Sequence, residues 1–284
     1  ISKLLILFLT TTFLYAQPTI TSFSPTSGAI GTTVTITGTG FNTTATNNIV
    51  WFGATNANVT NASANSLTVT VPVGATFAPI SVTDTTTGLT AYSNKPLVVV
   101  FPSSQLIDAM SFAANNVGFT TGVNPYSVAI GDLDGDGKPE LAIANHTSNT
   151  VSVFRNTSTS GSITSSSFAS KVDFATGANP YSVAIGDVDG DGKADLVIAN
   201  YNSHTVSVFR NTSTSGLITS SSFASKVDFA TGNGVISIAI GDVDEDGKPD
   251  LVTANGGGSI SVLRNTSISG YITSTSFASK VDFT

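Results

Sequence analysis

The nine residues Asp132-Leu-Asp-Gly-Asp-Gly-Lys-Pro-Glu140 decide how this sequence folds, because they occur three times. They return as Asp187-Val-Asp-Gly-Asp-Gly-Lys-Ala-Asp195 and as Asp242-Val-Asp-Glu-Asp-Gly-Lys-Pro-Asp250, with start points 55 residues apart. These windows hold 13 of the 18 acidic residues of the 284-residue chain. Carboxylates at every second position repel one another, so the clustering predicts a cation in each loop.

Each acidic loop lies between patterns that are typical of strands. In the first unit we expect strands at residues 126–130, 140–144, 150–155 and 169–175, separated by turn residues. Four antiparallel strands per unit are typical of a propeller blade. The third unit has one residue fewer between Asn255 and Asn265, which a turn tolerates. The recurring aromatic residues are predicted to form the core between blades: Phe168, Phe174, Phe223 and Phe229.

The repeat units define the domain boundaries of the C-terminal part. We expect a linker at residues 101–110 and repeats at residues 111–176, 177–231 and 232–284. Known propellers use about four to eight blades, so three units predict an array that continues beyond residue 284. The alternative is a three-unit array that pairs with another chain.

The N-terminal part has a different composition. Residues 1–16 resemble an export signal, because Lys3 precedes the apolar run 4–9 and Ala16 offers a small residue for cleavage. A membrane anchor is the alternative, but the run is shorter than the roughly 20 residues of a spanning helix. Residues 18–100 alternate in hydropathy, with expected strands at 32–37, 48–52, 67–71 and 78–83. This pattern predicts a small sandwich of the immunoglobulin kind.

The composition favours an all-β, exported protein. Only 10% of residues are charged, and Thr, Ser, Asn, Gly and Val suit short strands and turns. The net charge of −7 comes from the acidic loops, and no basic patch is interleaved with aromatic residues. We therefore expect no nucleic-acid partner and no membrane span. The chain has no cysteine, and extracellular calcium can stabilise a fold that lacks disulfides.

The spacing within the loops predicts calcium rather than magnesium. A tight turn can direct the carboxylates of positions 1, 3 and 5 at one hard cation, and calcium accepts such flexible oxygen coordination. Glycine at position 6 permits a positive φ, position 7 offers its backbone carbonyl while the lysine ammonium points to solvent, and position 9 adds a carboxylate. About three ions are expected, one per repeat. The predicted ligands are Asp132, Asp134, Asp136, Lys138 and Glu140, then Asp187, Asp189, Asp191, Lys193 and Asp195, and finally Asp242, Asp244, Asp246, Lys248 and Asp250.

Two positions depart from this pattern. Position 4 is Gly135 and Gly190 in the first two loops but Glu245 in the third, which is expected to strain the turn or add a carboxylate at its rim. Glu140 replaces aspartate at position 9 of the first loop. Position 12 is not acidic in any copy, so the loop is no EF-hand. We expect each ion to be structural and to stiffen the blade that holds it.

Both parts of the chain resemble known families. Ile20-Thr-Ser-Phe-Ser-Pro25, the stretch from Gly31 to Phe41 and Trp51-Phe-Gly53 resemble an IPT/TIG domain. The acidic loops with their strand flanks resemble FG-GAP/VCBS-type repeats, the calcium-loop blades also found in integrin head propellers. The first resemblance implies a spacer or contact module. The second implies calcium ligands at the four acidic positions and the lysine carbonyl of each loop.

Other polar residues do not indicate a catalytic site. His146 and His204 occupy different repeat positions, so they are expected to be surface turn residues. No serine-nucleophile elbow, zinc-binding helix or phosphate-binding glycine loop occurs. A repeated Lys-Val-Asp-Phe position is interpreted as a charge pair at a strand edge: Asp173, Asp228 and Asp282. Asparagines that open Asn-Thr-Ser sequences are interpreted as turns rather than glycosylation sites: Asn156, Asn211 and Asn265.

Taken together, the sequence predicts a secreted or cell-surface calcium-binding protein with a non-catalytic role in binding or adhesion. Its partner would be an extracellular protein or glycan that the sequence does not identify. The alternative is the non-catalytic N-terminal part of a secreted hydrolase or lyase whose catalytic domain lies beyond residue 284. A third possibility is a structural spacer without a ligand.

Overall fold

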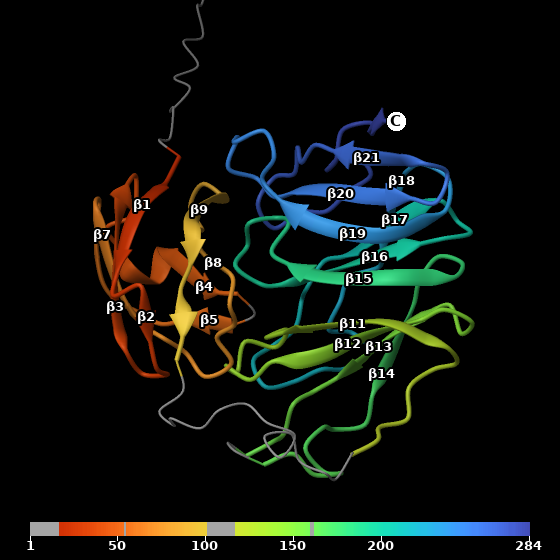
Figure 1. Ribbon diagram of the computed structural model, residues 1–284, viewed down its shortest axis with the longest axis horizontal. Helices are drawn as coiled ribbons and strands as arrows, with labels where there is room; N and C mark the ends of the chain where they lie inside the picture. Colours follow the sequence, from red (N-terminus) through yellow and green to blue (C-terminus); the bar gives the residue numbers. More distant parts are fainter. Residues whose placement is uncertain (1–16, 54, 101–116, 160–161) are drawn as a thin grey trace, which may run out of the picture.

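The computed structural model describes residues 17–53, 55–100, 117–159 and 162–284 (Figure 1). The predicted export signal and linker lie outside the described residues. Regular structure in the described part is almost entirely β, with one 3-10 turn at Ala45–Asn47. The predicted all-β fold is confirmed. In the same residues no helix has the length and apolar character needed to cross a membrane.

The N-terminal unit is an immunoglobulin-like sandwich. Its strands are β1 (Thr19–Ser24), β2 (Ser27–Gly28), β3 (Thr33–Thr39), β4 (Asn48–Phe52), β5 (Thr55–Ala57), β6 (Val59–Ser63), β7 (Ser66–Thr70), β8 (Pro79–Asp84), β9 (Leu89–Pro96) and β10 (Val98–Val99). One sheet has the order β1-β3-β7-β6 and the other β5-β4-β8-β9, with a short parallel pair of β10 and β2. Alternation buries one face of each sheet, as Val34 and Ile36 on β3 illustrate.

The C-terminal unit consists of three four-stranded sheets, or blades, of identical topology. Blade 1 contains β11 (Pro125–Gly131), β12 (Glu140–Asn145), β13 (Thr150–Phe154) and β14 (Val172–Ala175); blade 2 contains β15 (Pro180–Gly186), β16 (Asp195–Asn200), β17 (Thr205–Phe209) and β18 (Val227–Ala230); blade 3 contains β19 (Val235–Gly241), β20 (Asp250–Asn255), β21 (Ser259–Leu263) and β22 (Val281–Phe283). Within each blade, consecutive strands pair antiparallel. The predicted strands of the first unit are confirmed, although its fourth strand begins at Val172 rather than residue 169.

The pairing register repeats from blade to blade. Ile143 lies opposite Val128 and Ser152, and 55 residues later Ile198 lies opposite Val183 and Ser207. Blade 3 keeps this register and absorbs its missing residue in the turn between β20 and β21, where Asn255 pairs with Ser259. As predicted, the deletion leaves the sheet intact.

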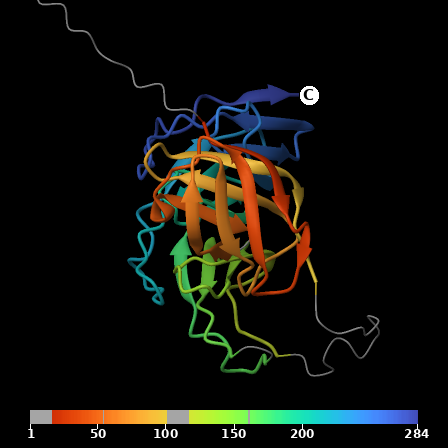
Figure 2. The ribbon, with the colours of Figure 1, turned by 90° about the vertical axis from the view of Figure 1, so that its left-hand side faces the viewer.

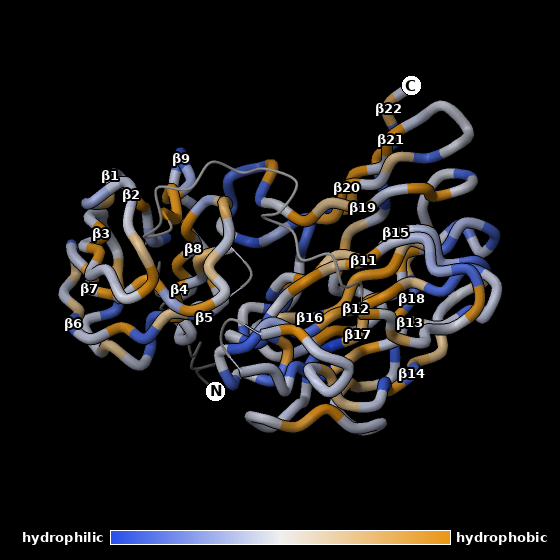
Figure 3. The backbone as a smooth tube through the Cα atoms, turned by 60° about the horizontal axis from the view of Figure 1, so that its bottom comes forward, coloured by the Kyte–Doolittle hydropathy of each residue, from blue (hydrophilic) through white to orange (hydrophobic). Residues whose placement is uncertain are grey.

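Neighbouring blades pack face to face through apolar residues. Phe174 and Phe223 lie edge to face with ring centroids 5.1 Å apart, and Phe229 and Phe277 repeat this contact at 4.9 Å. The predicted core role is confirmed for Phe174, Phe223 and Phe229, whereas Phe168 lies outside both core clusters and packs on Phe119 with ring centroids 5.2 Å apart. Figure 3 shows hydrophobic residues along the strands of the blades and hydrophilic residues in many of the loops that connect them.

The outer face of blade 3 is uncovered within the described residues. Val206 in blade 2 is fully buried, whereas its equivalent in blade 3, Ile260, is 44% exposed. Phe229 and its equivalent Phe283 differ in the same way, at 6% and 55%. The described blades therefore form an open stack.

The sandwich lies at the end of the blades where the acidic loops are (Figures 1 and 2). The backbone N–H of Thr90 on β9 donates to the carbonyl of Gly247 in the third acidic loop at 2.7 Å. Gly88 approaches the second loop so closely that a β-carbon on Gly190 would lie 2.5 Å from its carbonyl oxygen. The acidic loops are therefore both hairpin turns and contact points for the sandwich.

Candidate metal centres

Each acidic loop is a turn that reverses the chain between the first two strands of its blade. Its sixth residue has a positive φ of 86° at Gly137, 86° at Gly192 and 85° at Gly247, as predicted. The fourth residue is also left-handed, with φ of 70° at Gly135 and 62° at Glu245. Glutamate therefore adopts at this position a conformation that favours glycine.

Backbone N–H groups of the loop orient its carboxylates. In the first loop Asp132 accepts from Gly135 at 2.8 Å and from Gly137 at 3.1 Å. Asp134 accepts from the N–H of Asp136, and Asp136 from that of Lys138. The second loop repeats these four bonds with residues 55 positions later. The chain thereby folds around the carboxylates instead of dispersing them into solvent.

The structure gathers three carboxylates in every loop. Ligand oxygens within 4.8 Å of one another come from Asp132, Asp134 and Asp136 in the first loop, from Asp187, Asp189 and Asp195 in the second, and from Asp242, Asp244 and Asp246 in the third. Asp191 does not belong to the group of the second loop, and Glu140 and Asp250 do not belong to those of their loops.

One carboxylate oxygen in each loop is buried and has no hydrogen-bond partner among the residues that the structure describes: Asp134 Oδ2, Asp189 Oδ2 and Asp242 Oδ1. A buried anionic oxygen without a partner is costly, and a cation removes that cost. Carboxylate oxygens in a flexible loop are the ligands that calcium prefers. The residues present therefore fit a calcium ion in each loop.

The ninth residue of each loop ties the loop to the third strand. Glu140, Asp195 and Asp250 are fully buried. Asp195 accepts one backbone N–H from Val188 in its loop at 3.0 Å and another from Asn211, just beyond β17, at 2.8 Å. Glu140 and Asp250 make the equivalent pairs of bonds. In all three blades this carboxylate therefore holds the loop against the end of the third strand. Only in the second blade does it also belong to the group of three clustered carboxylates.

The lysine side chains differ from the expectation that they point to solvent. The ammonium groups of Lys138, Lys193 and Lys248 donate to the carbonyls of Ser158, Ser213 and Ser267, at 3.1, 2.8 and 2.8 Å. These serines lie about 20 residues further along, beyond the third strand. The reason for the difference is that the segment after the third strand passes close to the loop and offers a free carbonyl.

Asn211 and Asn265 each connect their blade to the acidic loop of the preceding blade, a role that the sequence did not predict. The side-chain NH₂ of Asn211 in blade 2 donates to Ala194 and to Leu133 of the first loop in blade 1, both at 2.7 Å. Asn265 in blade 3 donates in the same way to Val188 of the second loop. The recurrence of Asn-Thr-Ser after the third strand was the signal. Both side chains are 1% exposed, which agrees with the turn interpretation rather than glycosylation.

Further hydrogen bonds attach two of the loops to the following blade. The first loop also accepts from Ser213 and Ser215 of blade 2, and the second from Ser269 of blade 3. An ion in one of these loops would therefore hold two neighbouring blades together, whereas the sequence alone predicts an effect on one blade.

Burial disfavours the charged form of several loop carboxyl groups when no cation is bound. It raises the pKa of Asp132 to about 6, against the opposing effect of the Gly137 and Gly135 N–H groups. Burial likewise raises the pKa of Glu140 to about 8, and burial with repulsion from Asp189 and Asp191 raises that of Asp187 to about 7. Without a cation, Glu140 and Asp187 would therefore hold protons near neutral pH, because their pKa values of about 8 and about 7 lie at or above it.

The remaining polar residues lie where the sequence predicts structural roles. Asp173, Asp228 and Asp282 pair with Lys171, Lys226 and Lys280 on the same strand edge. His204 has a positive φ of 54° in its turn, and its Nδ1 accepts from the Gly234 N–H at 2.9 Å. His146 stacks on Tyr126 with centroids 4.4 Å apart. The two histidines thus have no common site.

A sandwich followed by repeated acidic-loop blades defines a class of multidomain β protein with candidate metal-binding repeats. Comparison with protein families identifies the two parts. The chain contains an IPT/TIG domain at residues 18–99 and FG-GAP-like repeats matched at residues 132–198 and 187–253. The suspected family arrangement is confirmed.

Three solved structures from Bacteroides thetaiotaomicron VPI-5482 show distant similarity. An auxiliary nutrient binding protein is 12% identical with a TM-score of 0.28, and the match covers 94% of this chain and 70% of that one. A structural genomics protein of unknown function (13%, TM-score 0.33) and a putative phosphatase (14%, TM-score 0.32) are each matched over 87% of this chain. The chain spans 57% and 55% of their lengths. At these TM-scores they carry no argument about function, and no curated protein matches the chain.

Proposed function

We propose that this chain is a secreted or cell-surface binding or adhesion protein, non-catalytic, in which calcium ions stabilise the stack of blades. IPT/TIG and FG-GAP domains fit an extracellular binding role. The observation that carries the calcium proposal is the buried carboxylate oxygen without a partner in each of the three loops. Acidic residues committed to the loops leave few carboxylates for catalysis, which supports a non-catalytic role.

In this proposal calcium acts through structure. When bound, the ion supplies positive charge to the carboxylates of its loop. The chain's own residues transmit the effect, because Asn211 and Ser213 hold the first loop against blade 2, and Asn265 and Ser267 hold the second against blade 3. Ligand binding then relies on a stack whose blades keep a fixed spacing.

Thermal unfolding of the full chain in calcium and in chelator, with bound metal counted in parallel, tests the proposal. We expect about three ions per chain and a higher Tm in calcium. At 100 times its Kd, each ion would add about 2.7 kcal/mol to the free energy of unfolding. Equal Tm values with no bound metal would contradict the calcium proposal.

A matched pair of variants locates the effect. Asp189→Asn removes one charge from the second loop and is expected to bind one ion fewer and to melt earlier than the parent only in calcium. Asp228→Asn removes one charge from the same blade outside the loop, where the carboxylate pairs with Lys226. This control should keep all ions. If Asp189→Asn melts like the parent in calcium, the second loop is not a calcium site.

A further inference from the structure

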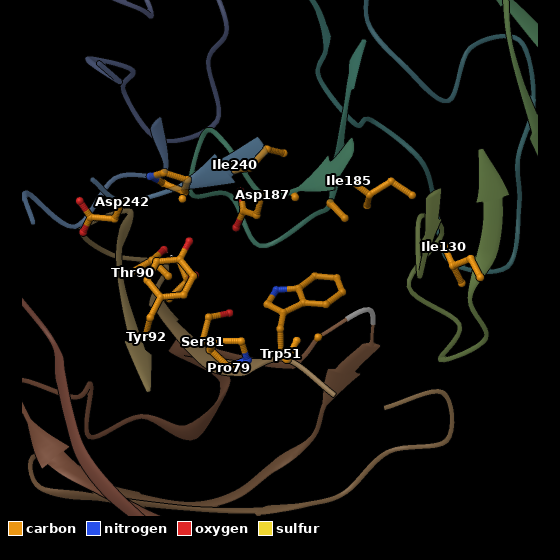
Figure 4. A pocket seen from close by; sticks show the side chains of 17 residues that line it. Trp51, Pro79, Ser81, Thr90, Tyr92, Ile130, Ile185, Asp187, Ile240 and Asp242 are labelled. Atoms are coloured by element: carbon orange, nitrogen blue, oxygen red, sulfur yellow. Dashed lines mark hydrogen bonds between the residues drawn. The ribbon is translucent and has the colours of Figure 1, made fainter. Parts of the chain in front are cut away.

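A cavity of about 470 Å³ lies between the sandwich and the blades. Figure 4 shows the rings of Trp51 and Tyr92 rising from the sandwich toward Asp187 and Asp242, with Ile185 and Ile240 beside them on the blade side. The strands that supply these residues are β4 and β9 of the sandwich and the ends of β15 and β19. The volume falls within the range of about 300–1,000 Å³ typical of small-molecule sites.

Trp51 is the residue that points to a ligand. Its ring packs against the core between blades 1 and 2, so its orientation is fixed. Its indole N–H is buried and has no hydrogen-bond partner among the described residues. A buried tryptophan N–H normally finds an acceptor, and a molecule bound in the open volume beside the ring would supply one.

The walls of the cavity combine apolar surface with hydroxyl groups. Ile130, Ile185 and Ile240 form an apolar side, while Ser81 and Tyr92 contribute hydroxyl groups from the sandwich. Tyr92 is 39% exposed, which leaves part of its side chain open to a ligand. A molecule that suits this lining has an apolar face for the isoleucines and hydroxyl groups at its edge for the polar side.

The acidic residues of the cavity determine which charge a ligand can carry. Asp187 and Asp242 are its acidic residues, so an anionic ligand would be repelled. Calcium in the second and third loops would engage these carboxylates and leave a cationic ligand no free partner, while the net negative charge that each loop keeps still disfavours an anion. Neutral, hydroxyl-rich molecules remain.

We propose that this cavity binds a neutral saccharide, with an apolar face of a pyranose ring against Ile185 and Ile240 and a hydroxyl group that accepts from the Trp51 indole N–H in the plane of the indole. This inference rests on the proposed binding function and names its ligand class and site. Tyr92 and Ser81 hydrogen-bond further hydroxyl groups. The ligand bridges the sandwich and the blades, so binding fixes the two units relative to each other.

Trp51 is the only tryptophan of the chain, which makes its fluorescence a direct reporter of the cavity. The full chain in saturating calcium is titrated with the methyl glycosides of glucose, galactose, mannose and N-acetylglucosamine and with neutral disaccharides, and calorimetry measures the same binding. We expect a saturable change for at least one saccharide, with a Kd of about 1 mM or tighter for a ligand of a dozen or more non-hydrogen atoms.

Two variants and two controls locate the site. Trp51→Ala should abolish the calorimetric signal, and Tyr92→Phe, which removes one hydroxyl and keeps the ring, should weaken binding about five-fold. Tyr271→Phe removes the same atom at an exposed position outside the cavity and should change nothing. Tyr126→Ala tests the exposed aromatic stack at the opposite end of the strands, where Tyr126 lies against His146. Loss of binding in Tyr126→Ala with retention in Tyr92→Phe would overturn the proposal.

The outcomes separate this inference from the proposed function. Calcium-dependent stabilisation without any saccharide signal would overturn the saccharide site and leave the calcium proposal standing. Binding of tetramethylammonium in place of every saccharide would likewise overturn it, because the cavity would then select cations. A saccharide signal without calcium-dependent stabilisation would support the site and overturn the calcium proposal.

Discussion

At the scale of single residues, the fourth position of the loops shows how one backbone conformation is kept with different side chains. Gly135 and Gly190 adopt it freely, whereas Glu245 is held at a φ of 62°. A left-handed conformation costs a non-glycine residue about 1–2 kcal/mol, so the rest of the loop must enforce it. The expected strain at Glu245 is therefore present, and the turn retains its shape.

The buried carboxylates predict that the calcium-free protein becomes less stable as the pH rises from acidic to neutral. The folded state holds protons on Asp132, Asp187 and Glu140 up to pKa values of about 6, 7 and 8, above the ordinary values of 3.8 and 4.5. The unfolded chain binds fewer protons between these limits, so the free energy of unfolding falls as the pH rises from about 4 to about 8.

Urea denaturation of the full chain in chelator at pH 5 and pH 8 measures this dependence, and greater stability at pH 5 is expected. The same pair of measurements in excess calcium is the control. There the ion competes with protons for the carboxylates, so the advantage of pH 5 should disappear. Greater stability of the chelated protein at pH 8 would contradict the environment described for these groups.

At the scale of elements, the asparagine after each third strand decides how firmly a loop is attached. Within the described part of the chain, the side-chain NH₂ of Asn156 in blade 1 donates only to Pro139 of its own blade, whereas that of Asn211 in blade 2 donates to its own blade and to blade 1. The backbone N–H of each residue bonds the ninth-position acid in the same way. The two positions therefore differ chiefly by one bond between blades.

This difference makes Asn156→Ala and Asn211→Ala a matched pair. Asn211→Ala should lower the free energy of unfolding by about 1 kcal/mol more than Asn156→Ala, because it also leaves the Leu133 carbonyl without its amide partner. Chemical denaturation in calcium measures both values. Equal losses would mean that the bond between blades contributes nothing to stability.

The elements themselves were predictable because their determinants are local. Alternating hydropathy located the strands of the first blade and β3, β4, β7 and β8 of the sandwich within a few residues of the observed bounds, and the glycine at position 6 of each loop located the turns. The other strands of the sandwich, β1 and β9 among them, were not predicted. The role of Asn211 was not predictable in this way, because its partner Leu133 lies 78 positions earlier in the chain. The lysine ammonium groups were misplaced for the same reason, since their acceptors lie beyond the third strand.

At the scale of the whole molecule, the main feature is the placement of the sandwich against the acidic loops. No sequence pattern encodes this arrangement, since it depends on close contacts between remote segments such as Thr90 with Gly247 and Gly88 with Gly190. The Trp51 cavity exists only because of that placement. Trp51 was therefore recognisable from sequence as part of a domain motif, while its position in a cavity was not.

Gly135→Ala and Gly190→Ala test the placement. Both glycines have a φ of 70°, but a β-carbon on Gly135 would meet nothing within 4 Å, whereas one on Gly190 would strike the backbone of Gly88. Both variants should lose about 1–2 kcal/mol from the left-handed conformation. Only Gly190→Ala should also displace the sandwich and shift the emission of Trp51 to longer wavelength. Identical emission spectra would show that the sandwich does not rest on this loop.

The repeated register has a consequence for how such a protein changes over generations. Thr205-Val-Ser-Val-Phe209 repeats Thr150-Val-Ser-Val-Phe154 without a substitution, and corresponding apolar residues line both junctions between blades. Since each blade offers its neighbours matching surfaces, gene duplication or loss of one 55-residue unit leaves no unmatched joint inside the stack. The array can therefore lengthen or shorten by whole units in evolution.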